Sequence, residues 1–447
     1  MNIPIALLTN FYQQIDDELK LKMENENFQT ELRMPITEQG KIQPYFDAWL
    51  EKVKVPRVNK GNSGKILINS DYTRMSEWTY NSMFDPNQTI ILSRSKETHY
   101  YGIPCENIEK YQQEHEEISR ELVKTASRIF DQYRDHAALG NEFFQKTFLN
   151  RIPFIVKSIS SSFQFYEKHN ISFLVVGTTE DLLSRALAIT GAIKGVKSIC
   201  LQHGILMGEE AFMPVFTTKA GVYGEYEKKW YLNRGLSEDR IAAIGHPKYD
   251  DIFRYSPSDK KDFLIEFGLD PNKLTLILIT GPNIEFEKLK KLIENIADDP
   301  KIQIIIKPHP WEMGKGKYGV YLELEKQYRF IKVSNSRKNN LYEFLSHSDG
   351  VISTLSTVVT ESILFNKPVF IFNFMISNRT YDYYDQLGEF IQSDPDRLYQ
   401  ILKDYFATHQ KKEIYNKIRN QYLSESFNDG SSGKKLINII KFANKRN

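Results

Sequence analysis

The chain has 447 residues, and its 59 lysines and arginines nearly balance its 57 aspartates and glutamates, so its formal charge is +2. This balance argues against a general nucleic-acid binder, which usually carries a basic excess. Hydrophobic residues make up 41% of the chain, enough for a large core, which excludes a disordered protein. The length predicts two or three domains.

Cysteine is scarce, since Cys105 and Cys200 are the only two. They cannot build a disulfide framework or a cysteine-rich zinc site, and they fit a reducing compartment. The apolar run Ile3 to Leu8 lacks the basic start of a signal peptide, and no window supplies the roughly 20 apolar residues of a membrane span. The expected location is therefore cytoplasmic, with peripheral contact at the inner face of the cell membrane left open.

The predicted elements begin after a polar, irregular extension over residues 1–60, which is expected to form surface helices and loops rather than core. Short β-branched runs then predict strands, and a long charged segment with apolar residues at helical spacing predicts at least two long helices. A regular alternation of strands and helices follows. The expected strands are 65–69, 89–92, 171–176, 197–201, 220–223 and 241–244, and the expected helices lie within 107–168 and at 181–193 and 225–233.

A polar stretch over residues 255–273, rich in Ser, Pro and Asp, is the expected domain boundary. Beyond it the alternation restarts. The expected strands are 274–279, 302–306, 330–333, 350–352 and 368–372, and the expected helices are 285–296, 341–345, 357–365, 395–407, 411–424 and 430–443. The predicted parts are 1–256, 257–425 and 426–447.

This pattern predicts two successive doubly wound α/β domains, each with a largely parallel sheet. Such sheets bind ligands at the carboxyl ends of their strands, so the residues directly after each strand are the candidates. They are Gln202-His203-Gly204, Gly245-His246-Pro247, Thr280-Gly281-Pro282-Asn283, Lys307-Pro308-His309 and Ser353-Thr354-Leu355-Ser356-Thr357. With two such domains, the expected site is the cleft between them.

The hydroxyl-rich segment 353–357 precedes a predicted helix. A helix N-terminus presents free N–H groups and about half a positive charge, and hydroxyl groups add donors for phosphate oxygens. The alternative is a Ser/Thr N-cap without a ligand. Glu361 lies one turn into the same helix, where its carboxylate could accept from both hydroxyls of a ribose; the alternative is a solvated helix glutamate.

Three histidines follow predicted strands. His309, with the charge of Lys307 nearby, is predicted to donate to a phosphate or leaving-group oxygen, or else to cap a proline-rich turn. His246 is either a site residue or part of a turn at a domain edge. His203 is the candidate general base, because a neutral imidazole can take a proton from an acceptor hydroxyl near pH 7. The acids at 180 and 181 could do the same, but they are interpreted as a helix N-cap and a first-turn acid.

Taken in order, these strings resemble GT-B nucleotide-dependent transferases that build bacterial surface polysaccharides. They resemble in particular the superfamily that joins CDP-glycerol glycerophosphotransferases of teichoic-acid synthesis with capsule and lipopolysaccharide glycosyltransferases. The resemblance covers about residues 171–372 and the ending Phe427-Asn428-Asp429-Gly430. It implies two Rossmann-like domains facing a central cleft, an N-terminal acceptor domain, a C-terminal nucleotide-donor domain, and a C-terminal helix crossing back to the first domain.

The resemblance also implies roles. His203 matches the general base and His309 the histidine beside the donor phosphates, while Ser353 to Thr357 match the Ser/Thr motif and Glu361 the ribose glutamate. The predicted donor site comprises Gly281, Lys307, Ser353, Thr354, Ser356, Thr357 and Glu361, and Gly204, His246 and Pro247 are expected donor or cleft residues.

The chain departs from the teichoic-acid enzymes in two motifs. It has Gln-His-Gly-Ile where they usually carry Trp-His-Gly-Thr, and Thr-Leu-Ser-Thr where they carry an acidic-Tyr-Ser-Ser motif. Both departures favour a glycosyltransferase that moves a sugar from a nucleotide-activated donor to a hydroxyl of a glycan or lipid-linked acceptor, with no metal or other cofactor required. The alternatives are a CDP-glycerol glycerophosphotransferase, an enzyme like the UDP-N-acetylglucosamine 2-epimerases, and a non-catalytic sugar-nucleotide binder.

Overall fold

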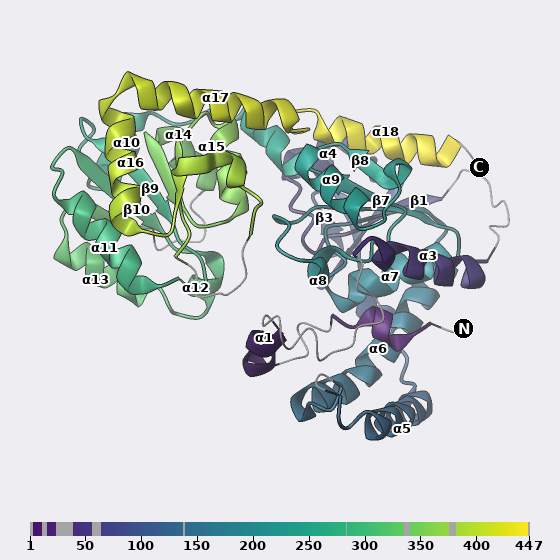
Figure 1. Ribbon diagram of the computed structural model, residues 1–447. Coiled ribbons are helices and arrows are strands. Elements are labelled where there is room, and N and C mark those ends of the chain that lie inside the picture. The colour runs from purple at the N-terminus through teal and green to yellow at the C-terminus, as the bar shows by residue number, and fades with distance from the viewer. Residues whose placement is uncertain are drawn as a thin grey trace. The chain divides into compact units, whose positions relative to one another are not determined.

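The chain forms two compact units, each described here by itself. A computed structural model describes residues 3–10, 16–23, 39–55, 64–136, 139–282, 284–334, 340–374 and 381–445. The first unit comprises Met1–Asp250 and Phe427–Asn447, and the second comprises Asp251–Ser426. Asn283 and parts of the predicted extension 1–60 lie outside the described residues. Each unit is an α/β domain with its own sheet, as predicted (Figure 1).

The first unit contains an eight-stranded sheet with the order β3-β4-β2-β1-β5-β6-β7-β8. Its strands are β1 (Lys65–Asn69), β2 (Thr89–Ser93), β3 (His99–Tyr100), β4 (Ile103–Asn107), β5 (Ile171–Val176), β6 (Lys197–Leu201), β7 (Lys219–Val222) and β8 (Ile241–Ala243). All neighbours are parallel except the edge pair β3 and β4. The six strands predicted in this part of the chain are confirmed, whereas β3 and β4 were not predicted.

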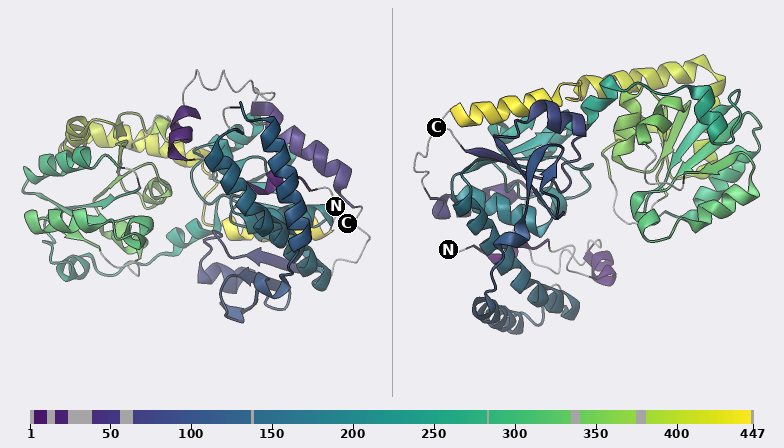
Figure 2. Two further views of the ribbon diagram at one scale, coloured as in Figure 1. Left: turned by 90° about the horizontal axis from the view of Figure 1, so that it is seen from below. Right: turned by 180° about the vertical axis from the view of Figure 1, so that it is seen from behind.

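Both faces of this sheet are covered by helices, because alternate side chains of a strand point to opposite faces. Leu67 and Leu174 face a core shared with α6 (Glu142–Lys168) and α7 (Leu182–Ile193). Ile68 and Val175 face a second core shared with α4 (Glu77–Met83) and α18 (Ser432–Lys445). The C-terminal helix therefore returns to the first unit, as predicted, and Figure 2 shows it in yellow along one side of this sheet.

The extension contributes to the core, so the prediction that it stays on the surface was wrong. Its described elements are η1 (Ile5–Leu8), α1 (Asp17–Met23), η3 (Gln39–Lys41) and α3 (Ile42–Val53). Leu8 and Phe46 are buried against the α7 side of the sheet. The apolar residues Phe46, Trp49, Leu50 and Val53 recur at i, i+3, i+4 and i+7, which is the stripe of a helix that packs on a core.

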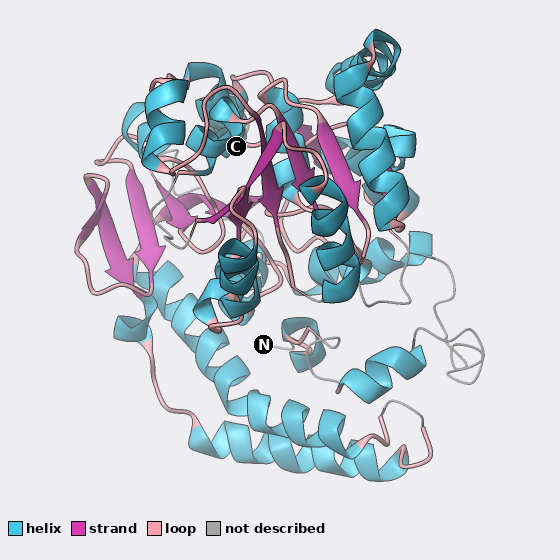
Figure 3. Ribbon diagram, turned by 90° about the vertical axis from the view of Figure 1, so that its left-hand side faces the viewer, coloured by secondary structure: helices cyan, strands magenta, loops and turns pink. Residues whose placement is uncertain are grey.

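The long charged segment forms a helical hairpin of α5 (Glu116–Gln132) and α6, held by packing of Phe130, Phe144 and Phe148. The hairpin extends away from the sheet (Figures 1 and 3). Even α6, with 27 residues, carries several charges, and no helix in the described residues is long and apolar enough to cross a membrane. The other elements of this unit are η4 (Ile108–Tyr111), α8 (Glu209–Phe212), α9 (Glu225–Asn233), η5 (Glu238–Arg240) and η6 (Pro247–Arg254), which runs on into the second unit.

The second unit contains a six-stranded parallel sheet with the order β11-β10-β9-β12-β13-β14. Its strands are β9 (Leu274–Ile279), β10 (Ile302–Lys307), β11 (Ile331–Val333), β12 (Gly350–Ser353), β13 (Val369–Phe372) and β14 (Ile391–Gln392). Its helices are α10 (Lys260–Glu266), α11 (Phe286–Ala297), α12 (Pro310–Gly314), α13 (Gly319–Gln327), α14 (Leu341–His347), α15 (Thr357–Leu364), η7 (Asp385–Phe390), α16 (Pro395–Ala407) and α17 (His409–Glu425). Helices α10 and α14 pack on one face of the sheet, and α11 and α16 cover the other (Figure 1).

Two of the motifs noted in the sequence bind each other inside the first unit. The Asp250 carboxylate accepts the backbone N–H groups of Ser432 (2.9 Å) and Gly433 (2.8 Å), and so caps α18. The Asn428 Oδ1 atom accepts the N–H of His246 at 2.8 Å. Gly245 has φ 71°, and a Cβ there would lie 2.6 Å from Asn428 Oδ1, so only glycine fits. The Gly-His-Pro and Asn-Asp-Gly motifs therefore anchor the C-terminal helix.

Replacing Asp250 with alanine is expected to lower the free energy of unfolding by about 1–2 kcal/mol, because α18 loses its N-cap and two N–H groups lose their acceptor. Asp85→Ala is the matched control, since Asp85 is an exposed aspartate of the same unit that accepts the N–H of Asn87 in a turn. Urea unfolding followed by intrinsic fluorescence measures both. Equal effects of the two substitutions would contradict the capping role.

Candidate functional site

The carboxyl ends of three adjacent strands in the second unit bring the predicted donor residues together. Ile279 is the register partner of both Lys307 and Ser353, so β9, β10 and β12 end side by side. The strand order reverses between β9 and β12, which is where doubly wound sheets bind ligands. A Cβ at Gly281 would lie 2.8 Å from Thr354 Cγ2, so glycine allows the loops after these two strands to touch.

Two hydroxyl groups at these strand ends are buried and have no hydrogen-bond partner among the described residues. Ser353 is fully buried and Thr354 is 6% exposed, and neither side-chain oxygen has a hydrogen-bond partner among the described residues. A buried hydroxyl without a hydrogen bond costs about 1–3 kcal/mol, and such groups are rare in folded proteins. The two oxygens therefore mark a place where a polar ligand is expected.

The Ser356 hydroxyl is a helix N-cap, the alternative role considered for this segment. Its Oγ atom accepts the N–H of Val358 at 3.0 Å and caps α15, whose first residue is Thr357. Glu361 follows one turn later and is only 5% exposed, so it is not a solvated helix glutamate. Burial, and then the charge of Glu361, raise the pKa of Tyr342 well above its ordinary value.

His309 occupies the capping position considered as its alternative. Its ring Nδ1 atom accepts the backbone N–H of Trp311 at 3.1 Å. The backbone N–H of His309 donates to Glu312 Oε2 at 3.0 Å. Because Nδ1 is an acceptor, the proton of the neutral ring lies on Nε2, which is the atom that can donate to a phosphate. Lys307, at the end of β10, is half-buried, and burial lowers the pKa of its ammonium group.

His203 lies in the first unit, directly after β6. Its imidazole stacks on Phe212 with 5.2 Å between centroids and meets the edge of Tyr72 at 5.8 Å. Glu180 Oε2 lies 3.7 Å from His203 Nε2. Burial, and then the charge of Arg74, lower the pKa of His203 to about 4, so the ring is neutral at pH 7 and can accept a proton.

The loop that carries His203 is held by its neighbours. The Gln202 side chain donates to the carbonyl of Gly204 at 2.7 Å, and Tyr223 donates to the carbonyl of Gln202 at 2.6 Å. A Cβ at Gly204 would have no atom within 4 Å, so this position faces open space. The backbone beside the imidazole is thus fixed and accessible.

His246 and Pro247 lie in the interior of the first unit. His246 is fully buried, its Nδ1 atom accepts the N–H of Lys248 at 3.0 Å, and burial lowers the pKa of its imidazole well below the ordinary value. Because its N–H donates to Asn428, His246 helps to hold the start of α18 against the first unit.

The sequence analysis did not select Tyr72 and Arg74, and it did not place Glu180 beside His203. Tyr72 and Arg74 follow β1, so the rule of searching after each strand would have found them, but it was not applied there. Asp181 is the predicted N-cap, since its Oδ1 atom accepts the N–H of Ser184 at 3.0 Å. Glu180, interpreted alongside it, instead approaches His203. The described residues contain no group of three or more His, Cys, Asp or Glu side chains placed to hold a metal ion.

Two parallel doubly wound sheets, each with polar residues at its strand ends, define a GT-B-like protein. Three solved structures share this fold. UDP-GlcNAc 2-epimerase from Neisseria meningitidis bound to UDP-GlcNAc has TM-score 0.55 and 11% identity, covering 85% of this chain and 98% of that one. HepE of Anabaena in complex with UDP and glucose has TM-score 0.52 and 14% identity, covering 85% and 100%. The wall teichoic acid polymerase TagF has TM-score 0.50 and 14% identity, covering 96% and 98%.

A family model matches a narrower region of the chain. Residues 224–441, a little under half of the chain, match the family model described as CDP-Glycerol:Poly(glycerophosphate) glycerophosphotransferase. Over this region the chain is similar to the CDP-glycerol glycerophosphotransferases, a family of transferases. No curated protein matches the chain.

The family match favours the alternative interpretation of the sequence over the preferred one. Two motif departures had favoured sugar transfer, whereas the match supports the glycerophosphotransferase alternative better. The matched range includes His309, Ser353 and Glu361, while His203 lies outside it.

Proposed function

We propose that the protein transfers glycerol phosphate from CDP-glycerol to a hydroxyl group of a cell-envelope polymer or lipid-linked acceptor. The observation that carries this proposal is the family match over residues 224–441, because it encloses the whole cluster around Gly281, Ser353, Thr354 and Glu361. The two unpartnered hydroxyls in that cluster support a bound polar ligand at the same place.

The second unit holds the donor in this proposal. The hydroxyls of Ser353 and Thr354, the N-terminus of α15 and the ammonium of Lys307 bind the diphosphate, since each supplies hydrogen-bond donors or positive charge. Glu361 accepts hydrogen bonds from the ribose hydroxyls. Its burial beside the start of α15 keeps the carboxylate in place for this role.

The first unit activates the acceptor. Neutral His203 takes the proton of the acceptor hydroxyl as its oxygen bonds to the phosphorus that carries the glycerol. The bond from that phosphorus to the bridging oxygen breaks, and CMP leaves with the electron pair. His309 and Lys307 stabilise the negative charge that develops on the leaving phosphate, an electrostatic effect that can contribute several kcal/mol.

Sugar transfer is the second candidate, because of the Thr354-Leu-Ser-Thr357 motif without an acidic residue. The two reactions release different nucleotides. Glycerophosphate transfer from CDP-glycerol releases a nucleoside monophosphate, whereas sugar transfer from a nucleoside diphosphate sugar releases a nucleoside diphosphate.

A thermal-shift panel of CMP, CDP, UDP and GDP, followed by transfer assays, tests the proposal. A nucleotide present at 100 times its dissociation constant stabilises the folded protein by about 2.7 kcal/mol, and we expect cytidine nucleotides to give the largest shift. With CDP-glycerol and a hydroxyl-bearing acceptor, CMP should accumulate. Release of UDP from a UDP-sugar would favour sugar transfer, and conversion of a UDP-sugar without acceptor would indicate an epimerase.

A further inference from the structure

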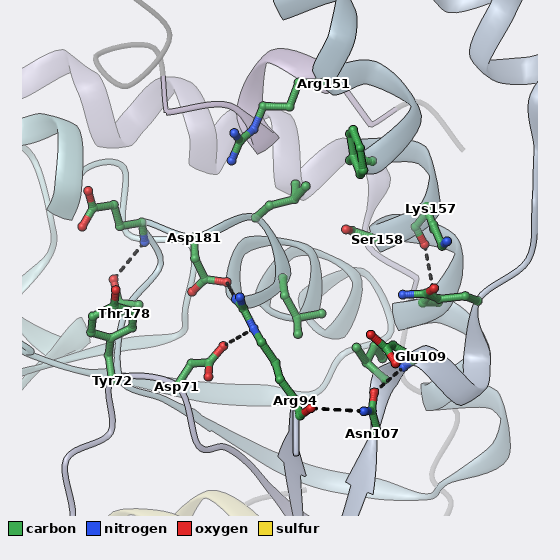
Figure 4. A pocket seen from close by; sticks show the side chains of 17 residues that line it. Asp71, Tyr72, Arg94, Asn107, Glu109, Arg151, Lys157, Ser158, Thr178 and Asp181 are labelled. Carbon is green, nitrogen blue, oxygen red and sulfur yellow. Dashed lines mark hydrogen bonds and ion pairs between the residues drawn. The ribbon is translucent and has the colours of Figure 1, made fainter. Parts of the chain in front are cut away.

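A cavity of about 920 Å³ lies in the first unit at the end of its sheet (Figure 4). The loops after the neighbouring strands β1 and β5 line it. The strands that follow β1 in the chain are added to the sheet in one direction, and those that follow β5 are added in the other. This reversal is the usual ligand position in a doubly wound sheet. A Cβ at Gly177 would lie 2.1 Å from the Tyr72 backbone, so glycine is required where the two loops meet. The volume suits a small organic ligand.

On one wall of the cavity, two carboxylates lie beside an arginine. Arg94 Nε lies 2.9 Å from Asp71 Oδ2, and its Nη2 atom lies 3.9 Å from Asp181 Oδ1 (Figure 4). Burial raises the pKa of Asp71, Arg94 opposes the rise and Asp181 adds to it. This wall offers carboxylate oxygens, which accept hydrogen bonds from hydroxyl groups.

The opposite wall is cationic. Arg151 and Lys157 come from α6 and line the cavity. The Arg151 Nε atom is buried and has no hydrogen-bond partner in the described part of the chain, and Figure 4 shows its side chain reaching towards the space above Asp181. Lys157 Nζ lies 3.2 Å from Glu114, an exposed glutamate. A guanidinium fork matches the oxygens of a phosphate, so this wall fits an anion.

Two residues that line the cavity also lie beside His203. Tyr72 and Glu180 line it and also contact or approach the His203 imidazole, at 5.8 Å between rings and 3.7 Å between Oε2 and Nε2. Tyr72 is 53% exposed and has φ 59°, a backbone conformation that few non-glycine residues adopt. An exposed aromatic ring is thus held between the cavity and the candidate base.

We propose that this cavity holds the acceptor, a polyhydroxylated chain end that bears a phosphate. The phosphate lies against Arg151, hydroxyl groups face Asp71 and Asp181, and the reacting hydroxyl passes Tyr72 to reach His203. This inference rests on the proposed function. The lining residues all lie between 71 and 183, outside the family-matched region, so the choice of acceptor belongs to this part of the chain.

Ligand-observed NMR titration of the full chain with glycerol 3-phosphate tests the inference. We expect Arg151→Gln to weaken binding at least tenfold, and glycerol, which lacks the phosphate, to bind the unaltered protein at least tenfold more weakly. Arg120→Gln is the matched control, because Arg120 is an exposed arginine on α5 paired with Glu116 at 3.8 Å, and it should change nothing. CDP affinity should be the same in all three proteins.

Several results would overturn the inference. They are equal binding by Arg151→Gln and the unaltered protein, absence of binding, and displacement of glycerol 3-phosphate by CDP. Arg151-dependent binding to phosphatidylglycerol vesicles but not to glycerol 3-phosphate would assign the anion to a membrane headgroup instead. Failure of CDP to bind, with Arg151-dependent binding intact, would reject the proposed function and leave the anion site standing.

Discussion

Replacing His203 with glutamine is expected to slow transfer by a factor of about 10²–10⁴, the usual contribution of a general base. Glutamine keeps a polar side chain of similar length but cannot take up a proton in this way. The affinity for the donor nucleotide should stay within twofold, because the proposed donor residues belong to the second unit. Initial rates of CMP release and a CDP titration measure the two quantities.

His409→Gln is the matched control, because His409 is an exposed histidine on α17. Glu180→Gln separates the two bases considered at this place, since Glu180 lies 3.7 Å from His203. Retained turnover in His203→Gln together with complete loss in Glu180→Gln would transfer the role of base to the glutamate. Circular dichroism and the unchanged CDP titration show that the variant is folded.

The pH dependence of the reaction follows from the same residue. The pKa of His203 is lowered to about 4, so the ring remains neutral and active as pH falls through 6.5, where an ordinary histidine would be half protonated. The acid limb of kcat/KM should therefore lie near pH 4–5. Arg74→Gln removes the second cause of the shift and should move the limb upwards. An acid limb at 6.5 in the unaltered protein would contradict the burial of the free base.

The strands were predictable because each is a short apolar run, and runs such as Ile171 to Val176 are buried on both faces of a parallel sheet. The two strands β3 and β4, at one edge of the first sheet, escaped prediction for the opposite reason. β3 has two residues, and β4 contains Pro104 and Glu106 in a half-buried pattern. Edge strands have less apolar surface to bury, so they leave a weaker signal in the sequence.

The candidate site was predictable to the extent that it depends on strand ends. Position alone selected His203 and Ser353, because topology brings strand ends to one edge of a sheet. Glu361 was selected by its place one turn into the helix that follows β12. It could not reveal that Tyr72 adopts φ 59° against His203, or that the partner of the Gly245-His246 motif is Asn428, 182 positions away. These contacts arise between segments distant in sequence and appear only when the chain is folded.

The second large effect concerns the donor site. Ser353→Ala and Thr354→Val are each expected to lower the affinity for CDP by about ten- to a hundredfold, because each removes a donor to a charged phosphate worth about 1.5–3 kcal/mol. The same substitutions should leave the unliganded protein equally stable or more stable by about 1 kcal/mol, since each removes a buried hydroxyl that has no partner among the described residues. Isothermal titration and urea unfolding measure the two effects.

Thr275→Val provides the contrast, because Thr275 is a fully buried threonine of the same sheet whose hydroxyl accepts from Gln303 Nε2 at 2.9 Å. Its loss should destabilise the unliganded protein by about 1–2 kcal/mol and leave CDP affinity unchanged. The opposite signs separate a hydroxyl kept for a ligand from one kept for the fold. Destabilisation by Ser353→Ala with unchanged CDP affinity would place Ser353 with Thr275 and move the donor phosphates away from the end of β12.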